Sequence, residues 1–265
     1  MMKSRLILAL LIAVSTFCSA DDWKKTYTVG DAPQLTVYTS DATIEVHAGG
    51  NGTIAALMET RGYTLTGGDP DIRMTDSQSG DNVNITAKER NGTRFCIACV
   101  RIAHLSITAP AGTRLTLKSS DGSIKVYDIK APADLHTSDG SIEVRGFDGT
   151  LHARTSDGSM KIAGRFDDLR LDTSDGSITV EVEHGSKVTT DWRLHTSDGS
   201  IRAALPDDLS ADVNFSTGDG SIHSDLSIND VHGPVSKRTL TGKLNSGGRL
   251  LEMRTSDGSI HVTRL

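Results

Sequence analysis

Apolar and polar residues alternate on both sides of a short turn sequence that recurs along most of the chain. The turn reads Ser-Asp-Gly-Ser, or Gly-Asp-Gly-Ser in one copy, and its aspartates are Asp121, Asp139, Asp157, Asp175, Asp198, Asp219 and Asp257. The first four are evenly spaced, the next two steps are slightly longer, and the last step, from Asp219 to Asp257, is close to two repeats. Residues 39–44 are a diverged copy near the N-terminus. Regular spacing of this kind indicates that repeated coils organise the fold.

Each repeat predicts two short strands around its turn. The residues six and four positions before the aspartate are apolar, as Leu115 and Leu117 are, and so are those three and five positions after it, as Ile124 and Val126 are. Between them lie outward columns of mixed sign, one of which contains Lys118, His136, Arg154, Asp172, His195 and Arg254. Period-two alternation is typical of half-buried strands, and no segment has the 3.6-residue stripe of a helix.

A further column of threonines stands at the corner of most of the turns, and it contains Thr137, Thr155, Thr173, Thr196 and Thr255. The column shares the parity of the apolar positions, so we expect an inward ladder of hydroxyl groups.

Two all-β architectures fit a strand and turn pattern at this period. One is a parallel β-solenoid, in which coils of about 18 residues lie on one another at about 4.8 Å. The alternative is an antiparallel β meander or sandwich with Asp-Gly hairpins. The solenoid is favoured because equivalent turns would then touch, which explains why they are nearly identical. In such a turn we expect the Asp side chain to accept the N–H two residues on, and Gly to supply a positive φ.

Composition and charge reduce the number of function classes that the chain can belong to. Only 4% of the 265 residues are aromatic, and the formal net charge is -6 at pH 7. An acidic protein with few stacking side chains is a poor partner for nucleic acid, so we expect no nucleic-acid binding. The scarcity of large side chains also fits a solenoid, which needs only a thin ladder of Ile, Leu and Val.

Residues 1–20 are expected to be a signal peptide. Lys3 and Arg5 precede a short apolar run that ends in small residues, and cleavage is expected after Ala20. Lipoprotein anchoring at Cys18 is disfavoured by the bulky Phe17 before it. No later apolar run is long enough to cross a membrane. We therefore expect export to the periplasm, the cell surface or the medium.

The remaining chain is expected to form one domain. Residues 21–110 would make irregular N-terminal coils, and residues 111–265 would make the regular coils of the same solenoid.

Cys96 and Cys99 form a C-x-x-C pair in an apolar stretch. In an oxidising compartment, a local disulfide that tightens a turn is the favoured interpretation. A redox-active pair is the second interpretation, although no βαβ pattern surrounds it. A zinc half-site is the third, and it would need two further ligands.

The seven turn aspartates are the candidates for a metal site. A column of carboxylates about 5 Å apart could bind Ca²⁺ as exported β-rolls do, but here the second turn of each repeat is irregular and half of the ligands are missing. Turn chemistry on a solvated edge is therefore the favoured interpretation. The adjacent pairs Asp167–Asp168 and Asp207–Asp208 are expected to point apart, as neighbours in an extended chain do. We expect no catalytic residue and no cofactor.

Residues 105–126 contain a Pro-Ala-Gly step before the first regular turn, and residues 247–262 form a closing Gly-Gly to Ser-Asp-Gly-Ser coil. Together with the diverged copy within residues 26–46, these segments resemble the bacterial family of exported β-strand-repeat proteins called putative adhesins. The resemblance spans nearly all of the chain after residue 20. It implies a right-handed single-stranded β-helix in the cell envelope and no established catalytic residues.

The resulting functional prediction is an exported, non-enzymatic β-solenoid that acts as an adhesin or a structural module of the cell envelope. An envelope polysaccharide- or solute-binding protein, with or without Ca²⁺, is the alternative, and a β-helical polysaccharide lyase or hydrolase is the third. The expected partners are cell-surface, glycan or envelope protein. A binding groove rimmed by aromatic residues could use only Trp23 and Trp192.

Overall fold

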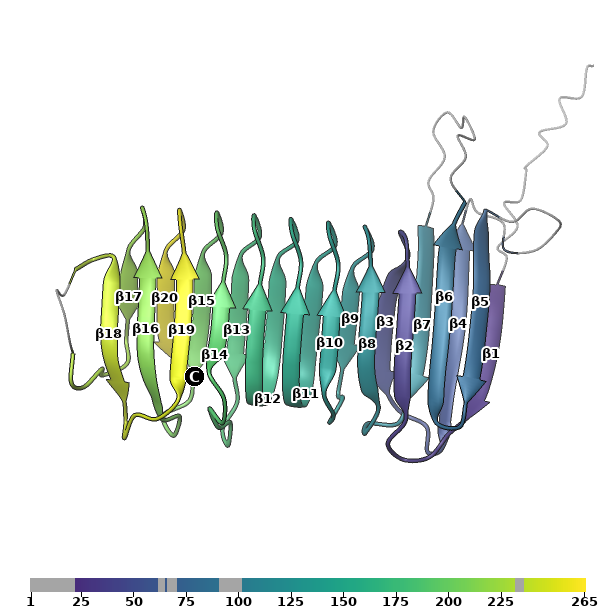
Figure 1. Cartoon of the computed structure of the whole chain (residues 1–265), viewed down its shortest axis with the longest axis horizontal. Coiled ribbons are helices and arrows are strands. Elements are labelled where there is room, and N and C mark those ends of the chain that lie inside the picture. The colour runs from purple at the N-terminus through teal and green to yellow at the C-terminus, as the bar shows by residue number, and fades with distance from the viewer. Residues whose placement is uncertain (1–21, 62–64, 66–70, 91–101, 232–235) are drawn as a thin grey trace, which may run out of the picture.

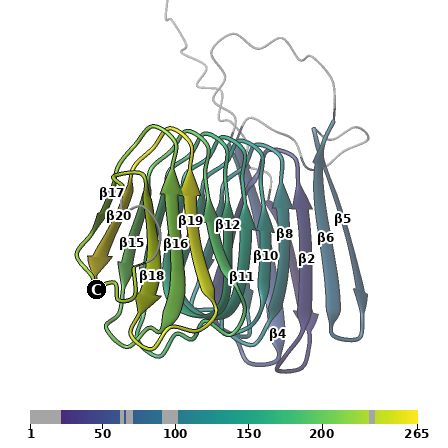
Figure 2. The ribbon, with the colours of Figure 1, turned by 60° about the vertical axis from the view of Figure 1, so that its left-hand side comes forward.

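The computed structural model describes residues 22–61, 65, 71–90, 102–231 and 236–265, and these form twenty strands and no helix. The strands stand side by side along the long axis of the molecule, and their turns line its two edges (Figure 1). All of them belong to one hydrogen-bonded network that is folded into two facing layers, because β11 and β12 run through both. Figure 2 shows the two layers joined by the turns. The predicted all-β, solenoid-like architecture is confirmed.

The layer nearer the viewer in Figure 1 is called the front sheet. Its strands, in spatial order, are β5 (Ile72–Ser79), β6 (Asn82–Glu89), β2 (Gln34–Thr39), β8 (Arg114–Ser119), β10 (Ala133–His136), the second half of β11 (Ile142–Arg154), the second half of β12 (Met160–Asp172), β14 (Trp192–His195), β19 (Leu250–Thr255), β16 (Ala211–Thr217) and β18 (Thr239–Leu244).

The other layer is called the back sheet. Its strands, in spatial order, are β1 (Asp22–Thr28), β4 (Thr53–Arg61), β7 (Ile102–Ala109), β3 (Thr43–Ala48), β9 (Ile124–Tyr127), the first halves of β11 and β12, β13 (Ile178–Val182), β15 (Ile201–Leu205), β20 (Ile260–Arg264) and β17 (Ile222–Ser224).

Equivalent positions of neighbouring repeats pair in parallel register. Ile142 pairs with Ile124 on one side and with Met160 on the other, so each partner is one repeat away in the sequence. Antiparallel pairs between named strands occur only toward the two ends of the stack, where β1, β4, β5 and β18 are added. The parallel registers exclude the alternative meander, in which consecutive strands would pair antiparallel.

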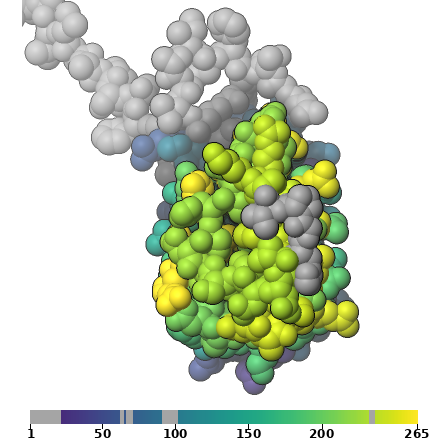
Figure 3. Space-filling view, turned by 90° about the vertical axis from the view of Figure 1, so that its left-hand side faces the viewer, coloured from purple at the N-terminus to yellow at the C-terminus, as the bar shows by residue number. Residues whose placement is uncertain are grey.

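The spatial order of the coils departs from the sequence order at both ends. The coil of β2 and β3 lies between β6–β7 and β8–β9, although it precedes both in the chain. The coil of β19 and β20 lies between β14–β15 and β16–β17, although it follows both. The long step from Asp219 to Asp257 therefore does not span two coils, as the repeat spacing suggested. The chain leaves the stack through β18 and returns to an inner position. Figure 3 views this end of the stack, where green and yellow segments lie together.

The core is the thin apolar ladder that the repeat predicts. Columns of Leu, Ile and Val from both sheets are buried, including Leu115, Leu117, Ile124 and Val126. Large side chains fill the core where the second turns bend: Phe147 and Phe166 stack with ring centroids 6.0 Å apart, and Trp192 meets Phe166 edge-on at 6.3 Å. These second turns are not separate loops, because β11 and β12 continue through them with local register shifts.

The glycine of each Ser-Asp-Gly-Ser turn is required for close stacking, and the prediction of a positive φ was wrong. None of these glycines is among the described residues with positive φ. Instead, a Cβ on Gly158 would lie 2.0 Å from the carbonyl oxygen of Gly140 in the neighbouring coil, and a Cβ on Gly176 would lie 1.9 Å from that of Gly158. Backbone therefore packs directly on backbone along this edge, and any larger residue would force the coils apart.

The threonine column forms the predicted inward ladder. Thr155 is 2% exposed, and its hydroxyl lies 3.0 Å from the carbonyl oxygens of both Ser138 and Gly140 in the neighbouring coil. The same oxygen accepts the N–H of Gly158 at 3.2 Å. Each threonine hydroxyl thus forms hydrogen bonds with buried backbone N–H and carbonyl groups of the turns that have no partner in a strand.

Candidate functional site

The seven turn aspartates lie one coil apart along one edge, and all seven side chains are exposed. Their backbone N–H groups bond to the preceding turn, as Asp157 does to the carbonyl of Ser138 at 3.0 Å. The predicted Asp side-chain bond to the N–H two residues on is absent from the seven turns. The N–H two residues after the aspartate is bonded instead to a serine hydroxyl of the neighbouring turn. Ser177 N–H, for example, donates to the hydroxyl of Ser159 at 3.2 Å.

The edge is more crowded electrostatically at its N-terminal part. Burial and the nearby Asp121 carboxylate raise the pKa of Asp41 above its usual range. Among the described residues, no group of three or more His, Cys, Asp or Glu side chains is placed to hold a metal ion.

The acidic pairs predicted to point apart do so. Asp167 is held by Arg165 through two hydrogen bonds of 2.7 and 2.8 Å, and that guanidinium lowers the pKa of Asp167. Its neighbour Asp168 lies on the other side of the strand, 3.2 Å from His152.

The second pair is also divided. Asp207 contacts Arg264 at 2.9 Å, whereas Asp208 contacts His184 at 3.1 Å. The N–H of Gly185 lowers the pKa of Asp208 by donating a hydrogen bond. Neither pair has the geometry of two carboxylates that act on one substrate.

The proposed aromatic groove is not formed by Trp192. This side chain is 1% exposed and its indole N–H donates to the carbonyl of Asp167 at 3.3 Å, so it belongs to the core. Trp23 packs partly buried on β1, at one end of the stack. Residues 1–20, where a signal peptide is expected, and the cysteines Cys18, Cys96 and Cys99 lie outside the described residues. No helix of the described chain has the length and apolar character needed to span a membrane.

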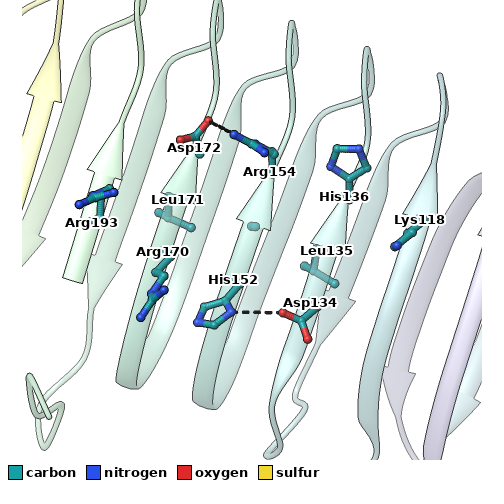
Figure 4. Close-up of a pocket in the computed structure, with 11 residues that line it drawn as sticks. Lys118, Asp134, Leu135, His136, His152, Arg154, Arg170, Leu171, Asp172 and Arg193 are labelled. Carbon is teal, nitrogen blue, oxygen red and sulfur yellow. Dashed lines mark hydrogen bonds and ion pairs between the residues drawn. The ribbon is translucent and has the colours of Figure 1, made fainter. Parts of the chain in front are cut away.

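The most distinctive surface feature is a hollow on the outer face of the front sheet (Figure 4). Its volume is about 470 Å³, and a second hollow of the same size adjoins it. The two share Asp172 and Arg193 and together are called the front-sheet groove. The charged and imidazole side chains that line it are Lys118, Asp134, His136, His152, Arg154, Arg170, Asp172, Arg193, His195, Glu252 and Arg254.

Part of this groove is a fixed network of ion pairs. His152 lies between two carboxylates, with Nδ1 3.2 Å from Asp134 and Nε2 3.2 Å from Asp168. Asp168 is only 9% exposed, and its other oxygen lies 3.6 Å from Nε of Arg170. The imidazole ring is therefore held in one orientation, and the acidic partner beneath it is shielded from solvent.

Two arginines of the groove pair with acids on the next strand. Arg154 lies 3.4 Å from Asp172, and Arg193 lies 3.0 Å from Glu252. Both guanidinium groups are about two-thirds exposed, so the pairs contribute little to stability and each cation remains accessible from solvent.

The remaining basic side chains of the groove are less constrained. Within the described part of the chain, Lys118, His136, His195 and Arg254 make no ion pair. The lining contains five Lys and Arg side chains against three Asp and Glu, whereas the whole chain has a net charge of -6. The groove is therefore a local region of opposite sign on an acidic protein.

The sequence indicated only one of the two rows that form this groove. The column that includes Lys118, His136 and Arg154 was recognised, but the row five positions before each turn aspartate was not assembled. That row contains Thr116, Asp134, His152, Arg170, Arg193 and Glu252. Aligning this position across the repeats would have revealed it, because parallel register places its members on adjacent strands.

Several solved structures are similar to this chain. One is described as a putative adhesin from Parabacteroides distasonis ATCC 8503, with 12% identity and a TM-score of 0.43 over 91% of this chain and 97% of that chain. A second is a putative cell adhesion protein from Clostridium sporogenes ATCC 15579, with 8% identity and a TM-score of 0.42 over 92% and 100% of the two chains.

A third is a putative lipid binding protein from Parabacteroides distasonis ATCC 8503, with 9% identity and a TM-score of 0.35 over 91% and 96%. No curated protein matches the chain. Residues 33–191 and 184–263 match the Toastrack DUF4097 family, which confirms the family resemblance seen in the sequence and shows that the chain belongs to this family.

Proposed function

We propose that this protein is a non-enzymatic binding module of the bacterial cell envelope or surface, exported through residues 1–20, that acts as an adhesin. The observation that carries the proposal is that the inward and outward side chains of each strand have different roles. Inward side chains and turn hydroxyls are used to hold the coils together, while outward side chains stand in straight rows on a rigid scaffold. Such rows suit recognition of an extended surface or polymer.

The architecture in this proposal is a right-handed β-helix whose middle coils each correspond to one sequence repeat. Support comes from the parallel registers of β9, β11, β12 and β13, in which paired residues such as Ile124 and Ile142 lie one repeat apart. A rigid rod of this kind holds side chains at a repeat of about 4.8 Å.

A non-enzymatic role is supported by the contacts of the adjacent aspartate pairs. Asp167 and Asp168 are bound by different basic side chains, and so are Asp207 and Asp208. A polysaccharide lyase or hydrolase would need such groups to converge on one bond.

The test is a binding screen with the purified protein against glycan arrays, extracellular matrix proteins and intact bacterial and host cells. We expect saturable binding to at least one class, lost when the protein is heat-denatured. Absence of binding across all three classes would overturn the proposal. Shortening of a polysaccharide on incubation with the protein would instead establish the enzymatic alternative.

The envelope polysaccharide-binding alternative is favoured by one specific observation, the elongated front-sheet groove. The same screen, run with Ca²⁺ and with a chelator, separates this alternative from binding to protein surfaces. It also tests whether the exposed aspartates contribute through an ion.

A further inference from the structure

We propose that the front-sheet groove binds a linear acidic polysaccharide laid across the strands. The inference deepens the proposed binding function by naming the face and the ligand class, and so it rests on that function. Its basis is the sign, the spacing and the composition of the groove lining.

The first argument is charge complementarity. Cationic side chains outnumber carboxylates in the groove although the chain as a whole is acidic. An anionic polymer is therefore attracted to this face and repelled by the edge that carries the turn aspartates. Such a field selects an orientation as well as a ligand.

The second argument is spacing. His136 is in register with Lys118 on one neighbouring strand and with Arg154 on the other, so the three side chains form a row across the sheet. Adjacent members of such a row are about 4.8 Å apart. A chain with one acidic group per sugar ring presents charges at a comparable repeat. A compact ligand would contact only a few members of the row.

The third argument is the mixed polar composition of the groove. Asp134, Asp172 and Glu252 lie among the cations. Carboxylates accept hydrogen bonds from sugar hydroxyls, and arginines bind acidic sugar carboxylates bidentately. Among the residues that line the groove there is no Phe, Tyr or Trp on which bases could stack.

The histidines add N–H donors to the groove. His152 faces Asp134, Asp168 and Arg170, and this pairing fixes its position.

The other two imidazoles have different surroundings. His136 faces Lys118 and Arg154, with Asp134 on its own strand, while His195 faces Asp172 and Arg254, with Arg193 on its own strand. Neither imidazole makes an ion pair within the described chain, so its ring N–H can donate to an acidic sugar.

The test measures binding of the full-length exported protein to polygalacturonate at low salt and about pH 6, with neutral dextran as the uncharged control. The variant Arg154→Glu/Arg193→Glu reverses two exposed cations of the groove. Its matched control, Lys161→Glu/Arg202→Glu, makes the same change of charge on the exposed back sheet. We expect the front variant to lose at least about tenfold in affinity and the back variant to stay within about twofold.

A second arm uses the histidines. His136→Ala/His195→Ala removes two of these N–H donors and should weaken binding to polygalacturonate. Thermal melting of each variant checks folding. If the double arginine variant does not fold, Lys118→Glu, which breaks no ion pair within the described chain, provides the same test.

The outcomes are distinct. Equal losses in the front and back variants, or equal binding to dextran, would overturn the assignment of the groove. Tighter binding to single-stranded DNA than to polygalacturonate at the same salt concentration would overturn the ligand class. Failure to bind polygalacturonate, with cell or matrix binding retained in the screen, would remove this inference and leave the adhesin proposal standing. Failure of both measurements would remove both.

Discussion

The two edges of the solenoid are built in different ways. Along the Ser-Asp-Gly-Ser edge, backbone stacks on backbone, and a Cβ on the turn glycine of the inner coils, such as Gly158, would meet a neighbouring carbonyl oxygen at 2.0 Å. Along the opposite edge the turns differ from one coil to the next. Gly146 and Gly185 there adopt φ of 62° and 80°, and Arg165 joins Asp148 to Asp167.

This difference explains which residues repeat. A position whose backbone touches its copy in the next coil admits one solution, so glycine and threonine recur. A position held by side chains can be filled differently in each coil. The recurrence of the turn glycine and threonine is therefore a consequence of packing, and it is not by itself evidence for a ligand on that edge.

The sharpest test of the comparison replaces a stacked glycine. Gly158→Ala should lower the free energy of unfolding by about 3 kcal/mol, because its Cβ meets backbone that cannot rotate away. At the other edge, the Cβ introduced by Gly185→Ala would have no neighbouring atom nearer than 4.0 Å. This substitution should lower the free energy of unfolding by only about 1 kcal/mol, because alanine is strained in the left-handed conformation of residue 185. Urea denaturation measures both. Equal losses would show that the edges do not differ in this way.

The hydroxyl ladder gives the next largest effect. Thr155→Val keeps the shape of the side chain but removes the partner of Gly158 N–H and of the neighbouring carbonyls, which should cost about 2 kcal/mol. Thr179→Val, exposed on β13, is the control and should change stability by less than about 0.5 kcal/mol. A small effect at Thr155 would mean that water replaces its hydroxyl.

The opposite edge should respond through charge. Arg165→Gln is expected to cost about 1 kcal/mol near neutral pH, because it releases Asp148 and Asp167. The pKa of Asp167 is lowered in the folded protein, so its contribution is present above the unfolded value of about 3.9 and is lost as the pH falls through the folded value. The stability difference between the two proteins should therefore shrink in acid. A difference that is independent of pH would contradict the role of the ion pair.

Asp41 should show the reverse dependence. Its pKa is raised by burial and by Asp121, so folding is favoured by the protonated carboxyl below the unfolded value of about 3.9, and this advantage disappears as the pH rises through the folded value. Asp41→Asn should raise the melting temperature slightly at neutral pH and leave it unchanged in strong acid. Destabilisation at neutral pH would indicate that the carboxylate has a partner at this turn.

The smallest expected effect concerns the aspartate column. If the turn aspartates are solvated and bind no ion, a calcium chelator leaves the melting temperature unchanged. A decrease of many degrees would establish Ca²⁺ as a structural ligand and would give the Ser-Asp-Gly-Ser edge a second reason to repeat.

The sequence allowed the strands, the buried columns and the inward threonines to be predicted, because each depends on alternation within one repeat. Residues such as Leu117, Ile142 and Thr155 are buried as their parity required. The reason for the glycine could not be found in the same way, since its contact belongs to another coil. Alternation also explains why Trp192, at an apolar position, is a core residue rather than part of a binding surface.

The spatial order of the coils could not be predicted from the repeat pattern either. Similar sequences indicate that two coils can stack but not which ones do, so the insertion of β19 and β20 could not be read from spacing. The front-sheet groove depends on that order, because Glu252 and Arg254 reach Arg193 and His195 only through the inserted strand.

The inserted coil also determines the order in which the molecule can be completed during synthesis. Residues 211–224 leave the ribosome before residues 250–262, which become their neighbours. In the finished molecule they do not pair with residues 192–205, because the later strands lie between the two segments. A chain that stops before residue 250 therefore retains two unpaired strand edges where β19 and β20 belong. Strands of another molecule could be captured there.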